Sequence, residues 1–362
     1  MPIQYTKAEK IARFNPNGVG NTSSGLFGLP FEYADAEIVI IPVPWEVTTS
    51  YKGGTAQGPE AILHASPQLD LFDFDVADAW KIGTYLLPIS QEWKQKNVSL
   101  REKSAHYIHY LELGGKVENN IHFYSILAEI NSAGFHLNQW VTRIALKILA
   151  DGKIPAVLGG DHSSPLGLIE ALAKTYPNFG ILQIDAHADL RQSYEGFVFS
   201  HASIMYNALK YPQVSKLVQV GVRDICEDEV NYIKDSSGRI VPYYDHELKR
   251  SISIEGSTNW AAMCKEIVEQ LPAKVYISFD IDGLDPKLCP NTGTPVPGGF
   301  ELHQVFYLFN QVIASGREII GFDLCEVAPS PTGDSEWDAN VGARALYKLA
   351  TLAGMKRLVV NG

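Results

Sequence analysis

Short apolar runs alternate with helix-length segments along most of this chain of 362 residues. Most of these runs are rich in β-branched residues and carry few polar interruptions. This pattern is typical of strands that are buried on both faces of a sheet. The expected strands are 37–42, 154–158, 179–184, 217–221, 275–279, 318–322 and 357–360.

Helices are expected between these strands. Gly58, Pro59 and Glu60 mark one helix start, because proline and an acidic residue favour the first helical turn. The other expected helices begin at 163 and 301 or span 259–271 and 340–353. The alternation predicts βαβ units in a mostly parallel sheet that helices cover on both sides. An eight-stranded barrel would show the same alternation, so the pattern alone leaves the two architectures open.

Composition places the chain among ordinary globular proteins. It is 46% hydrophobic and 20% charged, which excludes disordered, collagen-like and coiled-coil chains. No linker rich in proline, glycine and serine divides it, so we expect one domain at 36–362 after an N-terminal arm at 1–35. The segment 90–125 is polar and aromatic, and its pattern favours neither helix nor strand. A chain this long buries a sufficient core without a structural metal, so any bound metal is expected to be functional.

Charge and targeting signals narrow the expected partners. Lys plus Arg number 30 against 41 Asp plus Glu, and no basic run occurs, so nucleic acid is not an expected partner. No apolar stretch approaches the 18 residues of a membrane span, and the N-terminus lacks a signal peptide pattern. We therefore expect a cytoplasmic protein without membrane contact. The four cysteines lie far apart and are expected to be reduced thiols.

Three of the expected strands end in motifs of acidic and imidazole side chains. The motifs are Gly-Gly-Asp-His-Ser at 159–163, Asp-Ala-His-Ala-Asp at 185–189, and Ser-Phe-Asp-Ile-Asp-Gly-Leu-Asp-Pro at 278–286. Functional groups of α/β proteins collect where strands end, at their carboxyl edge. A single motif of this kind could be a polar strand cap or a turn. Three of them, each directly after a β-rich run, indicate one common site.

The spacing within the motifs predicts that their side chains converge. Residues two apart in an extended chain point to the same side, which groups Asp185, His187 and Asp189. Asp280 and Asp282 are paired in the same way on another strand. Such crowded carboxylates cost several kcal/mol per uncompensated charge when they are buried, so a cation must offset them.

Two divalent metal ions satisfy this requirement. With His162 added, four carboxylates and two imidazoles are available, and shared carboxylates would let six side chains hold two ions. The oxygen-rich ligand set without thiols favours Mn²⁺ over a structural zinc. Ni²⁺, Co²⁺ and Zn²⁺ stay open, since the sequence does not give the geometry.

At these three motifs the sequence resembles the ureohydrolase family, which includes arginase, agmatinase, formimidoylglutamase and guanidine hydrolase. The resemblance extends from about Ile38 to the C-terminus. It implies a three-layer α/β/α sandwich with a mostly parallel sheet of about eight strands, a binuclear Mn²⁺ site, and assembly into trimers or hexamers. In the implied ligand sets, one ion is held by His162, Asp185, Asp189 and Asp280, and the other by Asp185, His187, Asp280 and Asp282.

The resemblance also implies a reaction, in which the C–N bond of a small cationic guanidino compound is hydrolysed to release urea. Asp189 would orient the attacking hydroxide. His201 matches a proton-shuttling histidine of arginases and agmatinases, a task that suits a pKa near neutrality. Glu326 matches the family glutamate that pairs with the guanidinium. A scaffold subunit without turnover is the alternative from another class, and the complete ligand set argues against it.

The substrate is predicted from the residues that follow the second motif. Arg191 stands where arginases carry an asparagine, and the stretch 189–202 is most similar to one branch of agmatinases. We therefore predict an agmatinase, with Arg191, Glu195 and Glu326 as substrate contacts. Guanidine hydrolases are close relatives of that branch and stay an alternative, whereas arginase and formimidoylglutamase are disfavoured. We also expect the segments 1–35 and 90–125 to narrow the entrance of the site.

Overall fold

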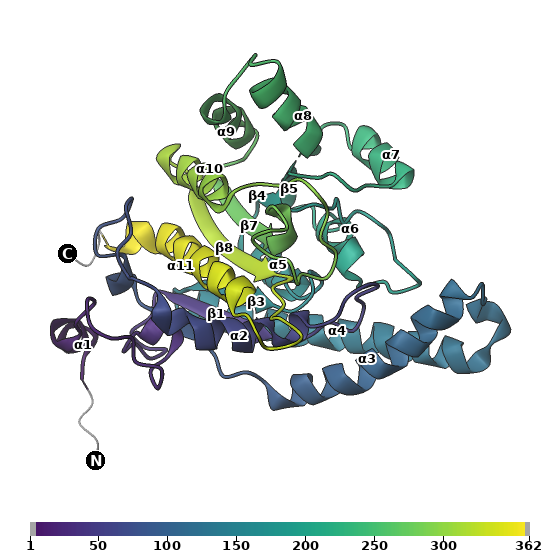
Figure 1. The fold of residues 1–362 in the computed structure, drawn as a ribbon, viewed down its shortest axis with the longest axis horizontal. Helices are drawn as coiled ribbons and strands as arrows, with labels where there is room; N and C mark the ends of the chain where they lie inside the picture. The colour runs from purple at the N-terminus through teal and green to yellow at the C-terminus, as the bar shows by residue number, and fades with distance from the viewer. Residues whose placement is uncertain (1–4, 359–362) are drawn as a thin grey trace.

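The computed structural model describes residues 5–358 and is built on one open sheet of eight strands (Figure 1). All the strand pairs in it are parallel, and among the described residues no further strand pairs with the outer strands β2 and β6. The chain therefore forms a sandwich and not a barrel. In spatial order the strands are β2 (Thr84–Leu86), β1 (Ile38–Val43), β3 (Ile154–Gly159), β8 (Glu318–Cys325), β7 (Lys274–Asp280), β4 (Phe179–Ile184), β5 (Val214–Val220) and β6 (Ile240–Tyr243).

Helices cover both faces of this sheet and give three layers. One face packs against α2 (Gly58–Ala65), α9 (Trp260–Glu269), α10 (Leu302–Ala314) and α11 (Trp337–Leu358). The other face packs against α3 (Gln91–Glu112), α4 (Ile121–Ala150), α5 (Leu166–Thr175), α6 (Ile204–Ala208) and α7 (Glu227–Asp235). The short helices α1 (Lys7–Arg13) and α8 (Asp245–Lys249) add apolar side chains to the first core.

The strand β1 shows how one run of residues serves two cores. Ile38 and Ile40 belong to the core on the α11 side, whereas Val39 and Ile41 belong to the core on the α4 side. Successive side chains of a strand point to opposite faces, so a strand between two helical layers needs apolar residues at every position. This is why the central strands could be found in the sequence as unbroken apolar runs.

Two expected elements differ from the structure. The strand expected at 357–360 is wrong, because Arg357 and Leu358 are the last residues of α11; positions 359 and 360 lie outside the described residues. Basic side chains in the last turn of a helix interact favourably with its dipole, which suits Lys356 and Arg357. The helix expected from 163 begins at Leu166, because the Asp161 carboxylate accepts from the Ser163 backbone and holds a turn there.

The arm at 5–35 contains a helix that the pattern did not reveal. Thr6 and Glu9 form a reciprocal capping box at the start of α1. The Lys10 ammonium lies 2.6 Å from the Asp35 carboxylate, and Lys7 donates to the Ile82 carbonyl. Lys7 also lies 3.7 Å from Glu37, which directly precedes β1. The arm is thereby attached near the amino end of β1, away from the carboxyl edge of the sheet.

The segment 90–125 forms α3 and the start of α4, two long helices joined by residues 113–120, which include a short 3-10 helix (Figure 1). We call residues 91–150 the helical hairpin. Side chains at Trp93, Leu100 and Tyr107 of α3 are buried at helical spacing. Asn97 and Ser104 are also buried on this face of α3. Because these two residues are polar, they interrupt the helical spacing of apolar residues, and the helix was not predicted from the sequence.

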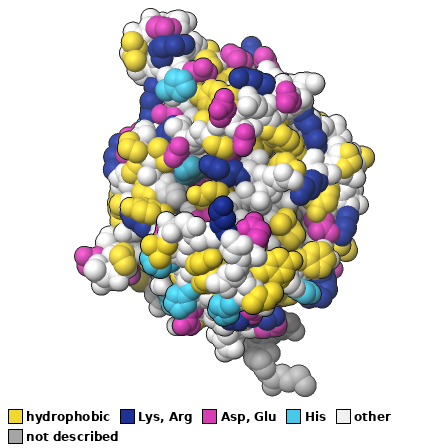
Figure 2. Space-filling model, turned by 90° about the vertical axis from the view of Figure 1, so that its right-hand side faces the viewer, with side chains coloured by type: hydrophobic (Ala, Val, Ile, Leu, Met, Phe, Trp, Pro, Cys, Tyr) yellow, Lys and Arg dark blue, Asp and Glu magenta, His cyan; other side chains and the backbone are white. Residues whose placement is uncertain are grey.

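Two features of the described residues concern the contacts predicted with membranes and with charged partners. No helix among residues 5–358 is long and apolar enough to cross a membrane. On the face shown in Figure 2, basic and acidic side chains are interspersed with apolar ones.

Candidate metal centre and substrate cavity

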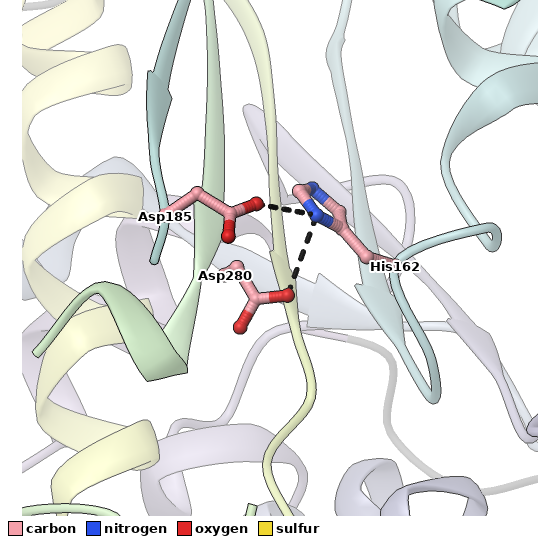
Figure 3. A group of neighbouring side chains, drawn as sticks. All are labelled: His162, Asp185 and Asp280. Atoms are coloured by element: carbon pink, nitrogen blue, oxygen red, sulfur yellow. Dashed lines mark ion pairs between the residues drawn. The ribbon is translucent and has the colours of Figure 1, made fainter. Parts of the chain in front are cut away.

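Four neighbouring strands in the middle of the sheet, β3, β8, β7 and β4, deliver the candidate site. His162 follows β3, Asp185 follows β4, and Asp280 is the last residue of β7. Because parallel strands end at one edge, these three side chains meet although they are far apart in the sequence (Figure 3). All three are buried.

The His162 ring faces three carboxylates with one nitrogen. Its Nδ1 atom lies 2.9 Å from Asp189, 3.0 Å from Asp185 and 3.3 Å from Asp280. The other nitrogen, Nε2, lies 2.9 Å from the Ser278 hydroxyl. Buried Nδ1 makes no hydrogen bond, despite these short distances.

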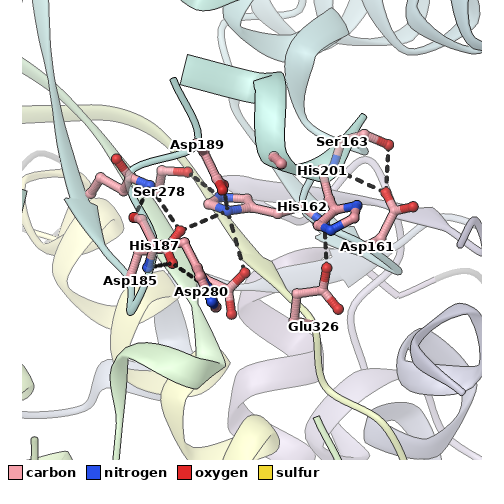
Figure 4. Close-up of polar contacts among 12 residues, drawn as sticks. Asp161, His162, Ser163, Asp185, His187, Asp189, His201, Ser278, Asp280 and Glu326 are labelled. Carbon is pink, nitrogen blue, oxygen red and sulfur yellow. Dashed lines mark hydrogen bonds and ion pairs between the residues drawn. The ribbon is translucent and has the colours of Figure 1, made fainter. Parts of the chain in front are cut away.

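The tautomer of His162 follows from the residues behind it (Figure 4). The Ser278 hydroxyl donates to the Asp323 carboxylate at 2.8 Å, so it can only accept from the imidazole. The proton of a neutral ring therefore lies on Nε2, and Nδ1 presents a lone pair to the carboxylates. Lone pairs that converge in this way repel one another without a cation. The donor set thus fits a metal ion.

A second group of side chains adjoins the first and shares Asp185. The His187 Nδ1 atom lies 3.1 Å from Asp282 and 3.6 Å from Asp185. Backbone amides fix both carboxylates, since Asp185 accepts from the His187 amide at 2.6 Å and Asp282 from the Ala186 amide at 3.0 Å. Asp185, His187 and Asp282 therefore form a second candidate metal group.

The electrostatics of the cluster show the same need for positive charge. Burial raises the pKa of Asp189 to about 7, with a further contribution from Asp185. Burial and the neighbouring Asp282 raise the pKa of Asp280 well above its usual range. Burial by itself would lower the pKa of His162, but the carboxylates around it raise that pKa well above its usual value. Without a metal ion the cluster would retain protons in place of the missing cations.

Two residues of this region have a strained backbone. Asp189 has a φ of 54° and Glu326 has a φ of 63°. Residues other than glycine rarely adopt positive φ values of this kind. The Asp189 carbonyl accepts from the amides of Met205 and Tyr206 at the start of α6. Such conformations persist only where the surrounding structure holds them, and they cluster at functional sites.

A cavity of about 270 Å³ opens beside the cluster. His187, Asp189, Arg191 and His201 contribute to its wall. The remaining lining residues are Ser50, Tyr194, Ala202, Asp224, Ile225, Cys226, Glu229 and Thr294. Metal-candidate side chains and substrate-candidate side chains therefore face one common space.

His201 lies in this wall, next to Thr48 and Tyr194. Its backbone amide donates to the Thr48 hydroxyl at 3.3 Å, and its ring lies edge-on to Tyr194 at 6.3 Å between centroids. Burial, with His187 and His162 nearby, lowers the pKa of His201 to about 3. This pKa lies below the near-neutral value expected from the sequence, and an imidazole of such low basicity binds a proton weakly.

Glu326 stands behind the cavity and does not line it. One carboxylate oxygen accepts from the His162 amide at 3.0 Å. The other oxygen is buried without a hydrogen-bond partner, beside Gly293. Burial and the nearby Asp161 raise the pKa of Glu326 well above its usual range. A carboxylate with one unused oxygen at this depth is suited to a cationic partner.

The structure brings most of the predicted residues together, but neither Glu326 nor Glu195 belongs to the cavity wall. The six predicted metal ligands share one cluster, and Arg191 and His201 line the cavity beside it. Glu195 does not line the cavity, because the turn that carries it directs the residue toward α3, where the Tyr107 hydroxyl reaches its carbonyl. Neither 5–35 nor 90–125 contributes a lining residue, so the expectation that these segments narrow the entrance directly is not met in this chain.

The sequence reading missed two acidic residues of the wall, Asp224 and Glu229. Both follow β5, which ends at Val220, so the rule that functional groups collect at strand ends could have found them. Glu229 accepts from the amides of Leu190 and Cys226, which joins the start of α7 to the loop after β4.

Comparison with known proteins identifies the family. The model of the arginase family matches residues 36–351. The chain belongs to the arginase family. It is accordingly a hydrolase of C–N bonds in amidines, and its parallel sandwich is the arginase fold.

Similar proteins carry the names of ureohydrolases. N(1)-aminopropylagmatine ureohydrolase of Thermus thermophilus is 32% identical, over 90% of this chain and 92% of the relative. The agmatinase of Neisseria meningitidis serogroup B is 28% identical, over 98% of this chain and all of the relative. Among solved structures, the agmatine ureohydrolase of Thermoplasma volcanium aligns with a TM-score of 0.66 at 21% identity, covering 97% of this chain and 99% of that one. The last comparison supports the fold alone.

Proposed function

We propose that this enzyme hydrolyses the guanidino group of agmatine, or of an agmatine extended by an aminoalkyl group, to urea and the corresponding amine. The observation that carries the proposal is the His162 lone pair, which faces three carboxylates beside a cavity with further acidic residues in its wall. The names of the similar ureohydrolases support the same chemistry.

The cluster is proposed to hold two divalent metal ions. His162, Asp185, Asp189 and Asp280 would bind one ion, and Asp185, His187, Asp280 and Asp282 the other. We propose Mn²⁺ because carboxylate oxygens dominate the donor set, with Ni²⁺ as the alternative. When bound, such a pair of ions lowers the pKa of a water molecule toward neutrality and so supplies a nucleophile under mild conditions.

Three residues of the chain would then serve the reaction itself. The Asp189 carboxylate orients the nucleophile toward the guanidino carbon. The His201 imidazole passes a proton from the attacking water to the nitrogen that leaves, so that the tetrahedral carbon collapses to urea and an amine. We retain Glu326 as the partner of the guanidinium through its one unused oxygen, although the residue stands behind the cavity wall.

The acidic wall of the cavity suits a second positive charge on the substrate. Asp224 and Glu229 place carboxylates in its wall, and agmatine carries an amine at the end opposite its guanidino group. The Arg191 guanidinium lies 4.8 Å from the centre of the Tyr194 ring and also lines the cavity. We retain Arg191 as a residue that contacts the part of the substrate beyond its guanidino group.

Urea release from a panel of guanidino compounds tests the proposal. The panel contains agmatine, N(1)-aminopropylagmatine, guanidine, arginine and a guanidino acid, each with Mn²⁺ and with Ni²⁺ separately. We expect the highest kcat/KM for one of the two agmatine compounds. A preference for guanidine would replace the proposed substrate with the smaller one, and no urea from any compound would contradict the function.

A further inference from the structure

The loop that joins β4 to α6 forms one wall of the substrate cavity. Tyr194 and His201 are its two lining aromatic residues, and the Tyr194 ring lies beside both Arg191 and His201. A shift of Tyr194 would therefore change the width of the cavity and the surroundings of the His201 ring. The contacts that hold this loop in place therefore affect which substrates fit the cavity.

A tight turn with a strained backbone carries Tyr194. The amide of Tyr194 donates to the Phe197 carbonyl at 3.2 Å, and the amide of Phe197 donates back to the Tyr194 carbonyl at 2.8 Å. The two central residues, Glu195 and Gly196, have φ values of 54° and 83°. This is the conformation of a type I′ turn, which favours Asn-Gly and is unfavourable for glutamate. The turn must therefore be held from outside.

The helical hairpin at 91–150 supplies that support through three hydrogen bonds. The Tyr107 hydroxyl on α3 donates to the Glu195 carbonyl at 2.8 Å. On α4, the Asn131 side-chain amide donates to the Gly196 carbonyl at 3.1 Å, and its oxygen accepts from the Val198 amide at 2.8 Å. The amide group of Asn131 thus bonds to the backbone of the turn through its nitrogen and to the residue after the turn through its oxygen.

Packing continues the same contact along α4. Leu127, Asn131 and Gly134 are spaced by four and three residues and lie on one face of the helix. Gly134 faces Phe199, where an added Cβ would lie 3.1 Å from the Cβ of that phenylalanine. The Tyr107 and Phe197 rings also pack together at 5.4 Å. The hairpin thus contacts the loop from Glu195 to Phe199.

We propose that Asn131 is a positioning residue that fixes the turn at 194–197 and thereby sets which guanidino substrate the cavity accepts. The inference rests on the proposed function for its substrates. It gives the segment 90–125 and the rest of the hairpin an indirect role: the hairpin adds no side chain to the cavity but determines where Tyr194 stands.

The test compares Asn131→Ala with Gln139→Ala, a matched loss of an amide from an exposed position of the same helix. For Asn131→Ala we expect KM for the best substrate to rise about tenfold, because two hydrogen bonds to the turn are lost. The ratio of kcat/KM between the longest and the shortest active guanidino compound should also change. Simple loss of folded enzyme would lower the rate with every compound and leave KM and this ratio unchanged.

A rescue variant makes the test specific to the turn. In Asn131→Ala/Glu195→Asn, an Asn-Gly pair favours the type I′ conformation without help from α4, so KM should return toward the wild-type value. Tyr107→Phe, which retains the ring against Phe197, should give a smaller rise in KM and serves if Asn131→Ala does not fold.

Hydrogen exchange keeps the inference separate from the substrate proposal. Amides of residues 194–199 should exchange faster in Asn131→Ala than in the wild type, and at the wild-type rate in Gln139→Ala. Unchanged exchange together with unchanged KM would overturn the positioning role. An enzyme that releases no urea from the whole panel would contradict the proposed function, while the exchange result would still decide whether Asn131 holds the turn.

Discussion

The metal cluster and the turn at 194–197 border the same cavity, yet they depend on different parts of the chain. The cluster is assembled from residues at or just beyond the ends of neighbouring central strands, so the order of strands in the sheet brings them together. The turn is held by Tyr107 and Asn131, which lie 88 and 65 residues away from their partners on a separate hairpin. The candidate metal ligands are thus positioned by the sheet, whereas the turn beside the cavity is held by two helices of a covering layer.

The two regions also differ in how they are stabilised. The cluster concentrates buried negative charge and is expected to require cations, whereas the turn is held by neutral hydrogen bonds and aromatic packing. Damage to the cluster should therefore abolish the reaction with little harm to the metal-free fold. Damage to the contacts of the turn should alter substrate selection and leave the chemistry in place.

Asp280→Asn should produce the largest effect. It removes a carboxylate from both proposed metal groups, and we expect urea release to fall by at least about 10³-fold with loss of bound metal. Because burial and Asp282 raise the pKa of Asp280, its ionised form destabilises the metal-free fold at neutral pH. The melting temperature of the metal-free variant should accordingly equal or exceed that of the wild type.

Metal analysis, urea assays and thermal melts measure these effects. Asp285→Asn, on the loop after the cluster and partly exposed, is the control. Retention of two metal ions per chain by Asp280→Asn would contradict its place in the cluster.

His201→Asn should reduce kcat by about 10²–10⁴-fold, because the proton acceptor in the cavity wall is lost. Metal content should stay unchanged, since the ring is not part of either metal group. Steady-state kinetics and metal analysis of the same preparation separate these outcomes. A joint loss of metal and activity would place His201 in the metal centre instead.

Removal of divalent metal by a chelator should lower the melting temperature, and readdition should restore it. An ion that binds only the folded state stabilises it by about 2.7 kcal/mol at a free concentration 100 times its Kd. Differential scanning fluorimetry with Mn²⁺, Ni²⁺ or no metal measures the shift. Asp280→Asn is the control, and an equal shift in that variant would show that the ions stabilise the protein elsewhere.

Glu195→Gln should have the smallest effect, and one that depends on pH. Burial, with help from Glu112, raises the pKa of Glu195 to about 7 from a usual value of 4.5. The ionised form is disfavoured in the folded state, so this penalty is absent below pH 4.5, grows as the pH rises to 7 and persists above it. The variant should exceed the wild type in stability by about 1 kcal/mol at pH 8, since partial exposure screens the full effect.

Chemical denaturation at pH 4.5 and pH 8 checks this prediction. Glu118→Gln, at an exposed position between α3 and α4, is the control. A difference between wild type and Glu195→Gln that is the same at both pH values would show that the carboxyl is not the cause.

The sequence allowed the central sheet and the cluster to be predicted because both follow from local rules. Apolar runs such as 179–184 mark strands buried on both faces, and the motif at 185–189 places alternate polar side chains at such a strand's end. The short edge strands β2 and β6 were missed, because few residues and partial burial leave little pattern. The prediction of a strand at 357–360 was wrong, because a short apolar run is compatible with either a helix or a strand and residues 357 and 358 belong to α11.

The sequence by itself determined which acidic and imidazole side chains meet at the carboxyl edge of the sheet, since the strand-end motifs carry them. Only the tertiary structure decided that Glu195 lies in a strained turn away from the cavity, that Asp224 and Glu229 complete the wall, and that Asn131 holds the turn in place. The reason is physical: a strand end places its own side chains through the alternation of the backbone, whereas a loop is positioned by whatever packs against it, and that partner can lie anywhere in the sequence.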